Sequence, residues 1–150
     1  MIDRRAVMLG LAVALWLPST SWALDPIFAD KGVAIRGADP VAYFTEGAYK
    51  AGLSEFTTKW RGAVWRFTSA AHRDRFVASP ERYAPQYGGY CAYAVSQGRT
   101  ASIDPNAFTV VGDKLYLNYS KSIEKTWRAD RDAYIKQADA NWPKLRDGKK

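Results

Sequence analysis

Two runs of alternating apolar and polar residues predict a first β-hairpin. Residues 55–60 and 63–68 are rich in β-branched and aromatic residues, and an Arg-Gly pair separates them. Such runs around a short glycine-containing turn are typical of antiparallel strands. In the second run, Trp65 and Phe67 fall on one face of the predicted strand and the residues between them fall on the other. We therefore expect one face of this hairpin to be buried.

A second hairpin is predicted further along the chain. Residues 108–111 and 114–119 are apolar runs on either side of Gly112-Asp113, a pair suited to a two-residue hairpin turn. The segment 103–106 is expected to form a turn before this hairpin. Residues 41–44 follow the turn-forming Asp39-Pro40 pair and are predicted as a short buried strand.

Helical spacing predicts three helices around these hairpins. The first follows Thr68 or Ser69, either of which can cap it, and carries Phe76 on its apolar side. A short second helix is expected through residues 80–83, because Ser79-Pro80 is a typical helix start.

The last predicted helix begins after Ser120. Its apolar residues recur at a spacing of about 3.6 residues, and we expect the Asn-Trp-Pro sequence at 141–143 to end it. The apolar positions of this helix are Ile123, Trp127, Tyr134 and Ala138. The pattern as a whole predicts one small α+β domain, with two β-hairpins packed against two or three helices.

The N-terminal 23 residues have the layout of a secretory signal peptide. Arg4-Arg5 precedes the apolar run 6–17, and Ser21 and Ala23 occupy the −3 and −1 positions of a small-x-small cleavage motif. The arginine pair also fits a twin-arginine signal. The apolar run is shorter than the roughly 20 residues of a spanning helix. We therefore expect export to the periplasm and cleavage after Ala23, leaving a mature protein with no stable membrane span.

Four segments are therefore expected along the chain. Residues 1–23 form the signal peptide, 24–36 a polar lead-in, 37–143 the folded domain, and 144–150 a basic tail.

Cleavage changes the residues available for chemistry. Both methionines leave with the signal, so the mature chain keeps one histidine, His72, one cysteine, Cys91, and no methionine. A single cysteine cannot form an internal disulfide in the oxidising periplasm. The formal charge of the full chain is +7, spread along the sequence and mixed with acidic residues. Nucleic-acid binding requires a clustered basic surface, so this charge distribution argues against it. We also expect the protein to be a monomer.

The segment 87–95, Tyr-Gly-Gly-Tyr-Cys-Ala-Tyr-Ala-Val, concentrates the chain's unusual residues. It contains the only cysteine, two adjacent glycines and three tyrosines. Glycines permit close approach of the backbone, and aromatic rings bury large areas around their neighbours. We expect a packing centre here and, if the protein has any chemistry, its reactive group.

Several motifs along the chain resemble the YHS domain. They are Asp39-Pro-Val41, Trp65-Arg-Phe67-Thr-Ser69, Phe76 and Ser79-Pro-Glu-Arg-Tyr83. The continuation is similar to exported YHS-domain (seleno)proteins, through Tyr87–Tyr93, Leu115–Tyr119 and Asp139–Pro143. The resemblance spans residues 32–143 and implies a YHS-like compact domain.

The resemblance also bears on metal and redox chemistry. Metal-associated YHS and TRASH-like domains have cysteines at three positions that here are Ala42, Thr68 and His72, so the family's metal role does not transfer directly. In the exported group, the position matching Cys91 is the one suspected of being selenocysteine in some members. That match hints at redox-relevant chemistry at Cys91.

The candidate residues each have a structural and a functional interpretation. Cys91 is either a small buried apolar residue or a thiol at the edge of a pocket. His72 is either a helix-face residue or a metal ligand or base, and a Cys91–His72 pair would resemble a nucleophile with its base. The aromatic residues are either core or the walls of a small-ligand pocket. The aromatic candidates for ligand binding are Tyr87, Tyr90, Tyr93 and Trp65.

Metal binding within one mature chain would rest on His72 and Cys91, together with carboxylates such as Asp39 and Asp74, or tyrosines. Structural zinc requires four nitrogen or sulfur ligands, which argues against it here. Soft copper sites favour cysteine and methionine, and a copper or haem contact with two protein ligands, or one shared between subunits, stays open.

Two functional hypotheses follow. The first is a non-catalytic periplasmic binding or accessory module for a metal ion, a small ligand or a protein partner. The second is a thiol-dependent redox protein that uses Cys91. The first is favoured because the sequence contains no resolving cysteine and no recognisable catalytic motif.

Overall fold

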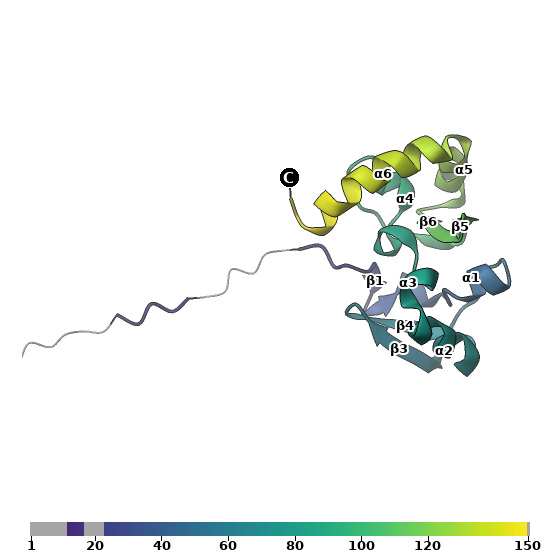
Figure 1. The fold of residues 1–150 in the computed structure, drawn as a ribbon, viewed down its shortest axis with the longest axis horizontal. Helices are drawn as coiled ribbons and strands as arrows, with labels where there is room; N and C mark the ends of the chain where they lie inside the picture. Colours follow the sequence, from purple (N-terminus) through teal and green to yellow (C-terminus); the bar gives the residue numbers. More distant parts are fainter. Residues whose placement is uncertain (1–11, 17–22, 150) are drawn as a thin grey trace, which may run out of the picture.

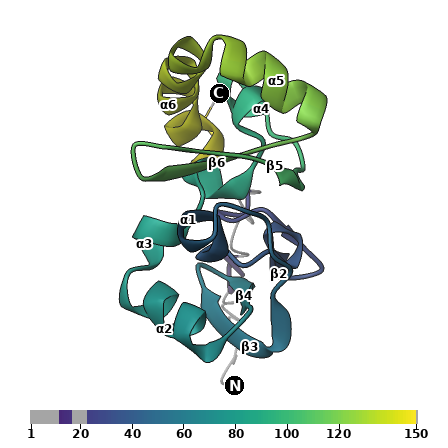
Figure 2. The same cartoon turned by 90° about the vertical axis from the view of Figure 1, so that its right-hand side faces the viewer.

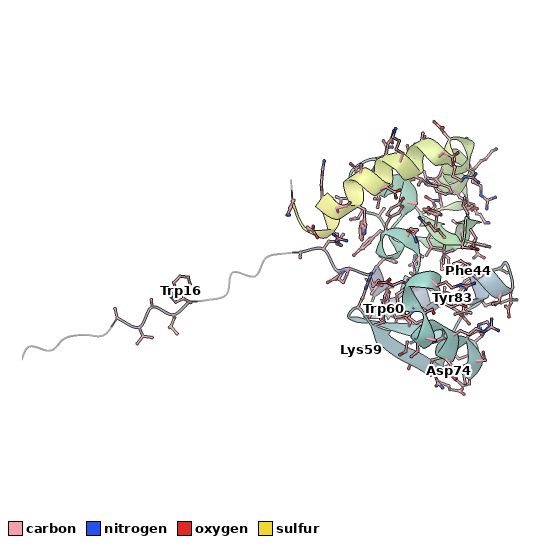
Figure 3. All side chains as sticks on the ribbon, in the orientation of Figure 1. Trp16, Phe44, Lys59, Trp60, Asp74 and Tyr83 are labelled. Atoms are coloured by element: carbon pink, nitrogen blue, oxygen red, sulfur yellow. The ribbon has the colours of Figure 1, made fainter. Side chains whose placement is uncertain are left out.

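The structure is a computed structural model that describes residues 12–16 and 23–149. The predicted signal peptide lies mostly outside the described residues, and the cleavage prediction at Ser21-x-Ala23 falls only partly within them. Trp16, in the short described stretch of this segment, is exposed and has neither helix nor strand structure (Figure 3). Within the described ranges, no helix is both long enough and apolar enough to cross a membrane.

The domain is a small α+β fold, as the sequence predicts, with two separate sheets and helices around them (Figures 1 and 2). Its elements, in chain order, are β1 (Ala29–Asp30), β2 (Val33–Ala34), η1 (Ile35–Gly37), α1 (Ala42–Thr45), β3 (Leu53–Trp60), β4 (Ala63–Phe67), α2 (Ala70–Ala78), α3 (Pro80–Tyr83), η2 (Gln86–Gly89), α4 (Ala92–Ser96), β5 (Asp104–Val111), β6 (Lys114–Asn118), α5 (Lys121–Ala129) and α6 (Arg131–Arg146).

The first predicted hairpin is confirmed and forms half of a four-stranded sheet. β3 and β4 pair antiparallel, and the strand order is β1-β2-β4-β3. Trp65 and Phe67 lie on the buried face, as their alternation predicts, and pack against Phe76 of α2. Helix α2 begins as expected, because the Ser69 hydroxyl accepts a hydrogen bond from the His72 backbone N–H.

The second predicted hairpin is also confirmed, and β6 is buried on both faces. Leu115 and Leu117 belong to the cluster beneath the four-stranded sheet, whereas Tyr116 belongs to a second cluster under α4, α5 and α6. Figure 2 shows this hairpin between those helices and the rest of the domain. β5 starts at Asp104, so residues 104–106 lie in a strand and not in the expected turn.

The segment 41–44, expected to be a short strand, is mostly helical instead. Residues 42–45 form α1, because Oδ1 of Asp39 accepts hydrogen bonds from the N–H groups of Val41 and Ala42 and so bends the chain into a helical turn. Val95, the last residue of the segment 87–95, lies in α4, where its side chain is fully buried.

The C-terminal helix differs from expectation in two ways. It is divided at Asp130, whose backbone leaves the helical region, into α5 and α6. It also continues through Pro143 to Arg146, so the Asn-Trp-Pro sequence does not end it and the predicted basic tail is partly helical. Leu145, beyond the proline, packs against the second cluster, and this contact favours continued helix.

The segment before Gly37 contributes to the core, although the sequence predicts a polar lead-in. Ile27 and Ile35 are buried in the first cluster. The Phe28 N–H donates to the Gly88 carbonyl oxygen at 2.8 Å, and this bond fastens the N-terminal segment to η2. The folded unit therefore begins ahead of the boundary expected from the sequence.

Candidate functional site

Cys91 lies at the junction of η2 and α4, directly before the first residue of α4. Its backbone N–H donates to the Ala101 carbonyl oxygen at 3.1 Å, which holds the residue against the following loop. The sulfur makes two polar contacts with the end of β6. It accepts a hydrogen bond from the Tyr119 backbone N–H at 3.3 Å, and the thiol donates to Oδ1 of Asn118 at 3.5 Å. The thiol is therefore held in a defined direction.

Asn118 is the fully buried polar side chain beside this thiol. Its Oδ1 also accepts the Tyr93 backbone N–H at 3.0 Å, and this bond fixes which way the amide points. In the part of the chain that the structure describes, the Nδ2 group of Asn118 has no hydrogen-bond partner. A buried donor without a partner is costly, and Asn118 shares this property with Arg66 Nε and Trp127 Nε1 among the described residues.

A cavity of about 180 Å³ opens over Cys91, and we call it the Cys91 cavity. Its lining combines a thiol, a guanidinium-bearing side chain, two tyrosines and small or aliphatic residues. These residues are Cys91, Tyr93, Ala94, Arg99, Ala101, Tyr119 and Ile123. Cys91 itself is only 1% exposed, whereas Tyr119 at the lining is 55% exposed. The thiol is thus shielded from bulk solvent while it still borders a space.

The aromatic residues predicted from the sequence to bind a ligand do not share one cavity. Tyr93 lines the Cys91 cavity, but Trp65 is fully buried, and its indole N–H donates to the Trp60 carbonyl oxygen at 3.1 Å. Trp65 is therefore a core residue in this structure. Tyr87 and Tyr90 lie instead in the second cluster.

The hydroxyls of Tyr87 and Tyr90 have internal partners. Tyr87 donates to Oδ1 of Asp139 on α6 at 2.8 Å, and Tyr90 donates to the Asp25 carbonyl oxygen at 2.9 Å. Burial raises the pKa of both phenols, and the Asp139 carboxylate raises the pKa of Tyr87 further. Both groups are therefore neutral hydrogen-bond donors at neutral pH.

His72 does not line the Cys91 cavity. It contacts Asp39 instead. Its Nδ1 lies 2.6 Å from Oδ2 of Asp39, a carboxylate that is fully buried. Thr68 donates to the same oxygen through both its backbone N–H and its hydroxyl, each at 2.8 Å. Sequence reasoning missed the role of Asp39, since its partners lie 29 and 33 residues away and no local spacing connects them.

The arrangement around Asp39 does not fit a metal centre. Ala42, Thr68 and His72, the three positions where the resemblance implies cysteines, do meet around this carboxylate. The carboxylate oxygens are already used by hydrogen-bond donors, and His72 is the one nitrogen ligand among the three. Across the described ranges, no group of three or more His, Cys, Asp or Glu side chains is placed to hold a metal ion.

No protein-family model, curated protein or solved structure matches this chain. The resemblance to exported YHS-domain proteins therefore stays a prediction from the sequence motifs.

Proposed function

We propose that this protein is an exported, non-catalytic binding module that takes a small ligand in the Cys91 cavity. The observation that carries the proposal is the position of the Cys91 sulfur, which borders this cavity and is fixed by the Tyr119 N–H. A buried cysteine that only filled space would pack against apolar atoms on all sides.

The size and lining of the cavity favour a ligand of a few non-hydrogen atoms. Sites for drug-sized ligands occupy about 300–1,000 Å³, and the Cys91 cavity, at about 180 Å³, is smaller. Ala94, Ala101 and Ile123 supply an apolar wall, and Arg99 supplies a cation. A short organic anion matches both parts. Its carbon chain would contact the apolar wall, and its charged end would pair with the Arg99 guanidinium.

The N-terminal segment supports the export proposal. Ala23, the residue before the proposed cleavage point, is exposed, whereas Leu24 packs against the second cluster. The next residue is fastened to the domain by the bond from Tyr90 to the Asp25 carbonyl oxygen. Cleavage after Ala23 would therefore leave the docked residues in place.

A test follows the backbone amides of Tyr93 and Ala101 by NMR during titration with propionate and, separately, with Ag(I). We expect saturable shifts with propionate that weaken at least tenfold in Ala101→Leu, which fills the cavity. Ala140→Leu, a substitution at an exposed position of α6, is the matched control and should bind as the unmodified protein does. Stoichiometric Ag(I) binding that Cys91→Ser abolishes would make the ligand a soft metal ion. If neither probe binds, the binding proposal is wrong.

The second candidate function is thiol redox chemistry at Cys91, and the Tyr119 N–H is the observation that favours it. This N–H donates to the sulfur, and Arg99 adds a cation at the same cavity. A hydroperoxide would be reduced when the thiolate attacks its terminal oxygen. The S–O bond forms, the O–O bond breaks, and the alcohol leaves with one proton. Because the chain has no second cysteine, two molecules of an external thiol must return the sulfenic acid to the thiol, forming a disulfide and water.

One experiment distinguishes the two candidate functions, ligand binding and thiol redox chemistry. Protein exposed to hydrogen peroxide is trapped with dimedone and analysed by mass spectrometry at Cys91. Rapid formation of the sulfenic-acid adduct, together with no propionate or Ag(I) binding, would replace the binding proposal with the redox one. Slow oxidation with retained ligand binding supports the binding module.

A further inference from the structure

We propose that a larger cavity, separate from the one over Cys91, binds a small organic anion that carries an apolar ring. This cavity has a volume of about 490 Å³, within the range of sites for small molecules. It lies between the turn of the β3–β4 hairpin, α3, η2 and the C-terminal half of α6, and we call it the α6 cavity. No lining residue of the Cys91 cavity also lines the α6 cavity.

Aromatic side chains from three distant parts of the chain form its walls. Trp60 comes from the end of β3, Tyr87 from η2 and Trp142 from α6. Trp60 lies beside α3 (Figure 3), and the rings of Tyr87 and Trp142 meet edge to face with centroids 6.2 Å apart. Trp60 and Trp142 are only partly buried, so ring surface is left for a ligand.

Three cations converge on the same cavity. Arg61 comes from the β3–β4 turn, Lys114 from the start of β6 and Arg146 from the end of α6. Two carboxylates, Glu81 and Asp139, also line it, so the lining has an excess of positive charge.

The carboxylates are already engaged, whereas part of the positive charge is not. Glu81 pairs with Arg61 at 2.9 Å, and Asp139 accepts the Tyr87 hydroxyl. Of the three cations, Arg61 and Arg146 are already paired, Arg146 with Asp147 at 3.0 Å. Lys114 makes no ion pair with any described residue. A bound anion would meet the ammonium group of Lys114, which has no ion-pair partner to displace, whereas a bound cation would meet carboxylates that Arg61 and the Tyr87 hydroxyl already contact. This difference is why we infer an anion.

Much of the site is already organised. The Arg61 guanidinium carbon lies 4.3 Å from the centroid of the Trp60 ring while the same side chain pairs with Glu81. The Tyr87–Asp139 bond connects η2 to α6, and both residues line the cavity. A site whose walls are fixed before binding loses less conformational entropy when a ligand arrives.

The experiment measures quenching of tryptophan fluorescence during titration with naphthalene-2-carboxylate. The matched probes are 2-naphthylmethanol, which is neutral, and 2-naphthylmethylammonium, which is cationic. We expect saturable binding of the carboxylate, at least fivefold tighter than binding of the alcohol and weakened by added salt. Isothermal titration calorimetry checks the stoichiometry of one ligand per chain.

Substitutions then assign the site. Lys114→Gln should weaken carboxylate binding at least threefold and leave alcohol binding unchanged, and Lys114→Gln combined with Arg146→Gln should weaken it further. Lys125→Gln, at an exposed position of α5 outside the cavity, is the matched control. The proposal is overturned if the carboxylate shows no saturable binding, if the alcohol binds equally well, or if the ammonium probe binds more tightly. It is also overturned if Lys125→Gln loses as much affinity as Lys114→Gln. Ala101→Leu fills the Cys91 cavity and leaves the lining of the α6 cavity unchanged, so naphthalene-2-carboxylate binding that this variant retains is assigned to the α6 cavity.

Discussion

The carboxylate of Asp39 and the imidazole of His72 form a short buried contact, with Oδ2 and Nδ1 2.6 Å apart. The two residues are 33 positions apart, and their contact joins the start of α1 to the first turn of α2. Since Asp39 also accepts N–H groups at α1 and at the end of β4, one side chain organises three loop ends. Its partners explain why a charged residue is tolerated at a fully buried position.

Replacing this carboxylate should be strongly destabilising. Asp39→Ala leaves the Thr68 hydroxyl and three backbone N–H groups without their acceptor, so we expect a loss of about 3–5 kcal/mol in the free energy of unfolding. Urea denaturation monitored by circular dichroism measures it. Asp74→Ala removes an exposed carboxylate from α2 and should cost less than about 1 kcal/mol. Similar losses for the two variants would show that the Asp39 contacts contribute little.

The sequence predicted those parts of the fold that depend on local patterns. Both hairpins and the Ser69 and Ser120 helix caps are confirmed, because turn residues, alternation and capping hydroxyls act over a few positions. The errors have distant causes. Residues 42–45 are helical because of the Asp39 carboxylate, and α6 passes Pro143 while its last turn packs on the second cluster.

The candidate sites were predicted only in part, for the same reason. The burial of Cys91 among tyrosines follows from the composition of its own segment, and the structure agrees. The hydrogen-bond partner of the thiol, Asn118, and the cation of its cavity, Arg99, lie outside α4, and no spacing in the sequence connects them to the thiol. The α6 cavity depends on residues from five or more segments and left no sequence signal.

Gly88 should tolerate no side chain. Its φ is +63°, and a Cβ placed there would lie 2.1 Å from the Pro26 carbonyl oxygen. Gly88→Ala is expected to cost about 1–3 kcal/mol more than Gly98→Ala, because both have positive φ but Gly98 has open space around it. Thermal and urea unfolding of the two variants measure the difference. Equal losses would mean that the N-terminal segment moves aside without cost.

Cys91 should react slowly with bulky thiol reagents in the native protein. The residue is 1% exposed, so we expect slow reaction with 5,5′-dithiobis(2-nitrobenzoate), rapid reaction after unfolding in urea, and a monomer in the absence of reductant. Methyl methanethiosulfonate, a small reagent, should react faster than the bulky one with the folded protein. Fast native labelling by the bulky reagent together with a covalent dimer would show a surface thiol.

Tyr119 should control access to that thiol. Its side chain is 55% exposed and lines the cavity, so Tyr119→Ala is expected to raise the native labelling rate at least tenfold. Val110→Ala, at another exposed apolar position of the β5–β6 hairpin, is the matched control and should leave the rate unchanged. An equal increase in both variants would instead indicate general loosening of the hairpin.

Alkaline pH should destabilise the protein through Tyr87. Burial and the Asp139 carboxylate raise the pKa of this phenol in the folded state, with a smaller effect from Tyr116. Folding therefore favours the protonated phenol. Its contribution to stability is complete below the ordinary tyrosine pKa of about 10 and is lost as pH rises above that value. The free energy of unfolding, measured by urea denaturation from pH 7 to 11, should fall above about pH 10.

Tyr87→Phe isolates the contribution of this one group. The variant should lose about 1 kcal/mol at pH 7, because the bond to Asp139 is gone. Above about pH 10 its stability should fall less steeply than that of the unmodified protein, by about 1.4 kcal/mol per pH unit. The pH dependence of stability that remains in this variant comes from the other tyrosines with raised pKa values, Tyr43, Tyr90 and Tyr116. Tyr119→Phe, which alters an exposed ring, should leave the slope unchanged. If Tyr87→Phe retains the full slope, the Tyr87 hydroxyl ionises as readily in the folded protein as in the unfolded chain, and its bond to Asp139 does not stabilise the lining of the α6 cavity.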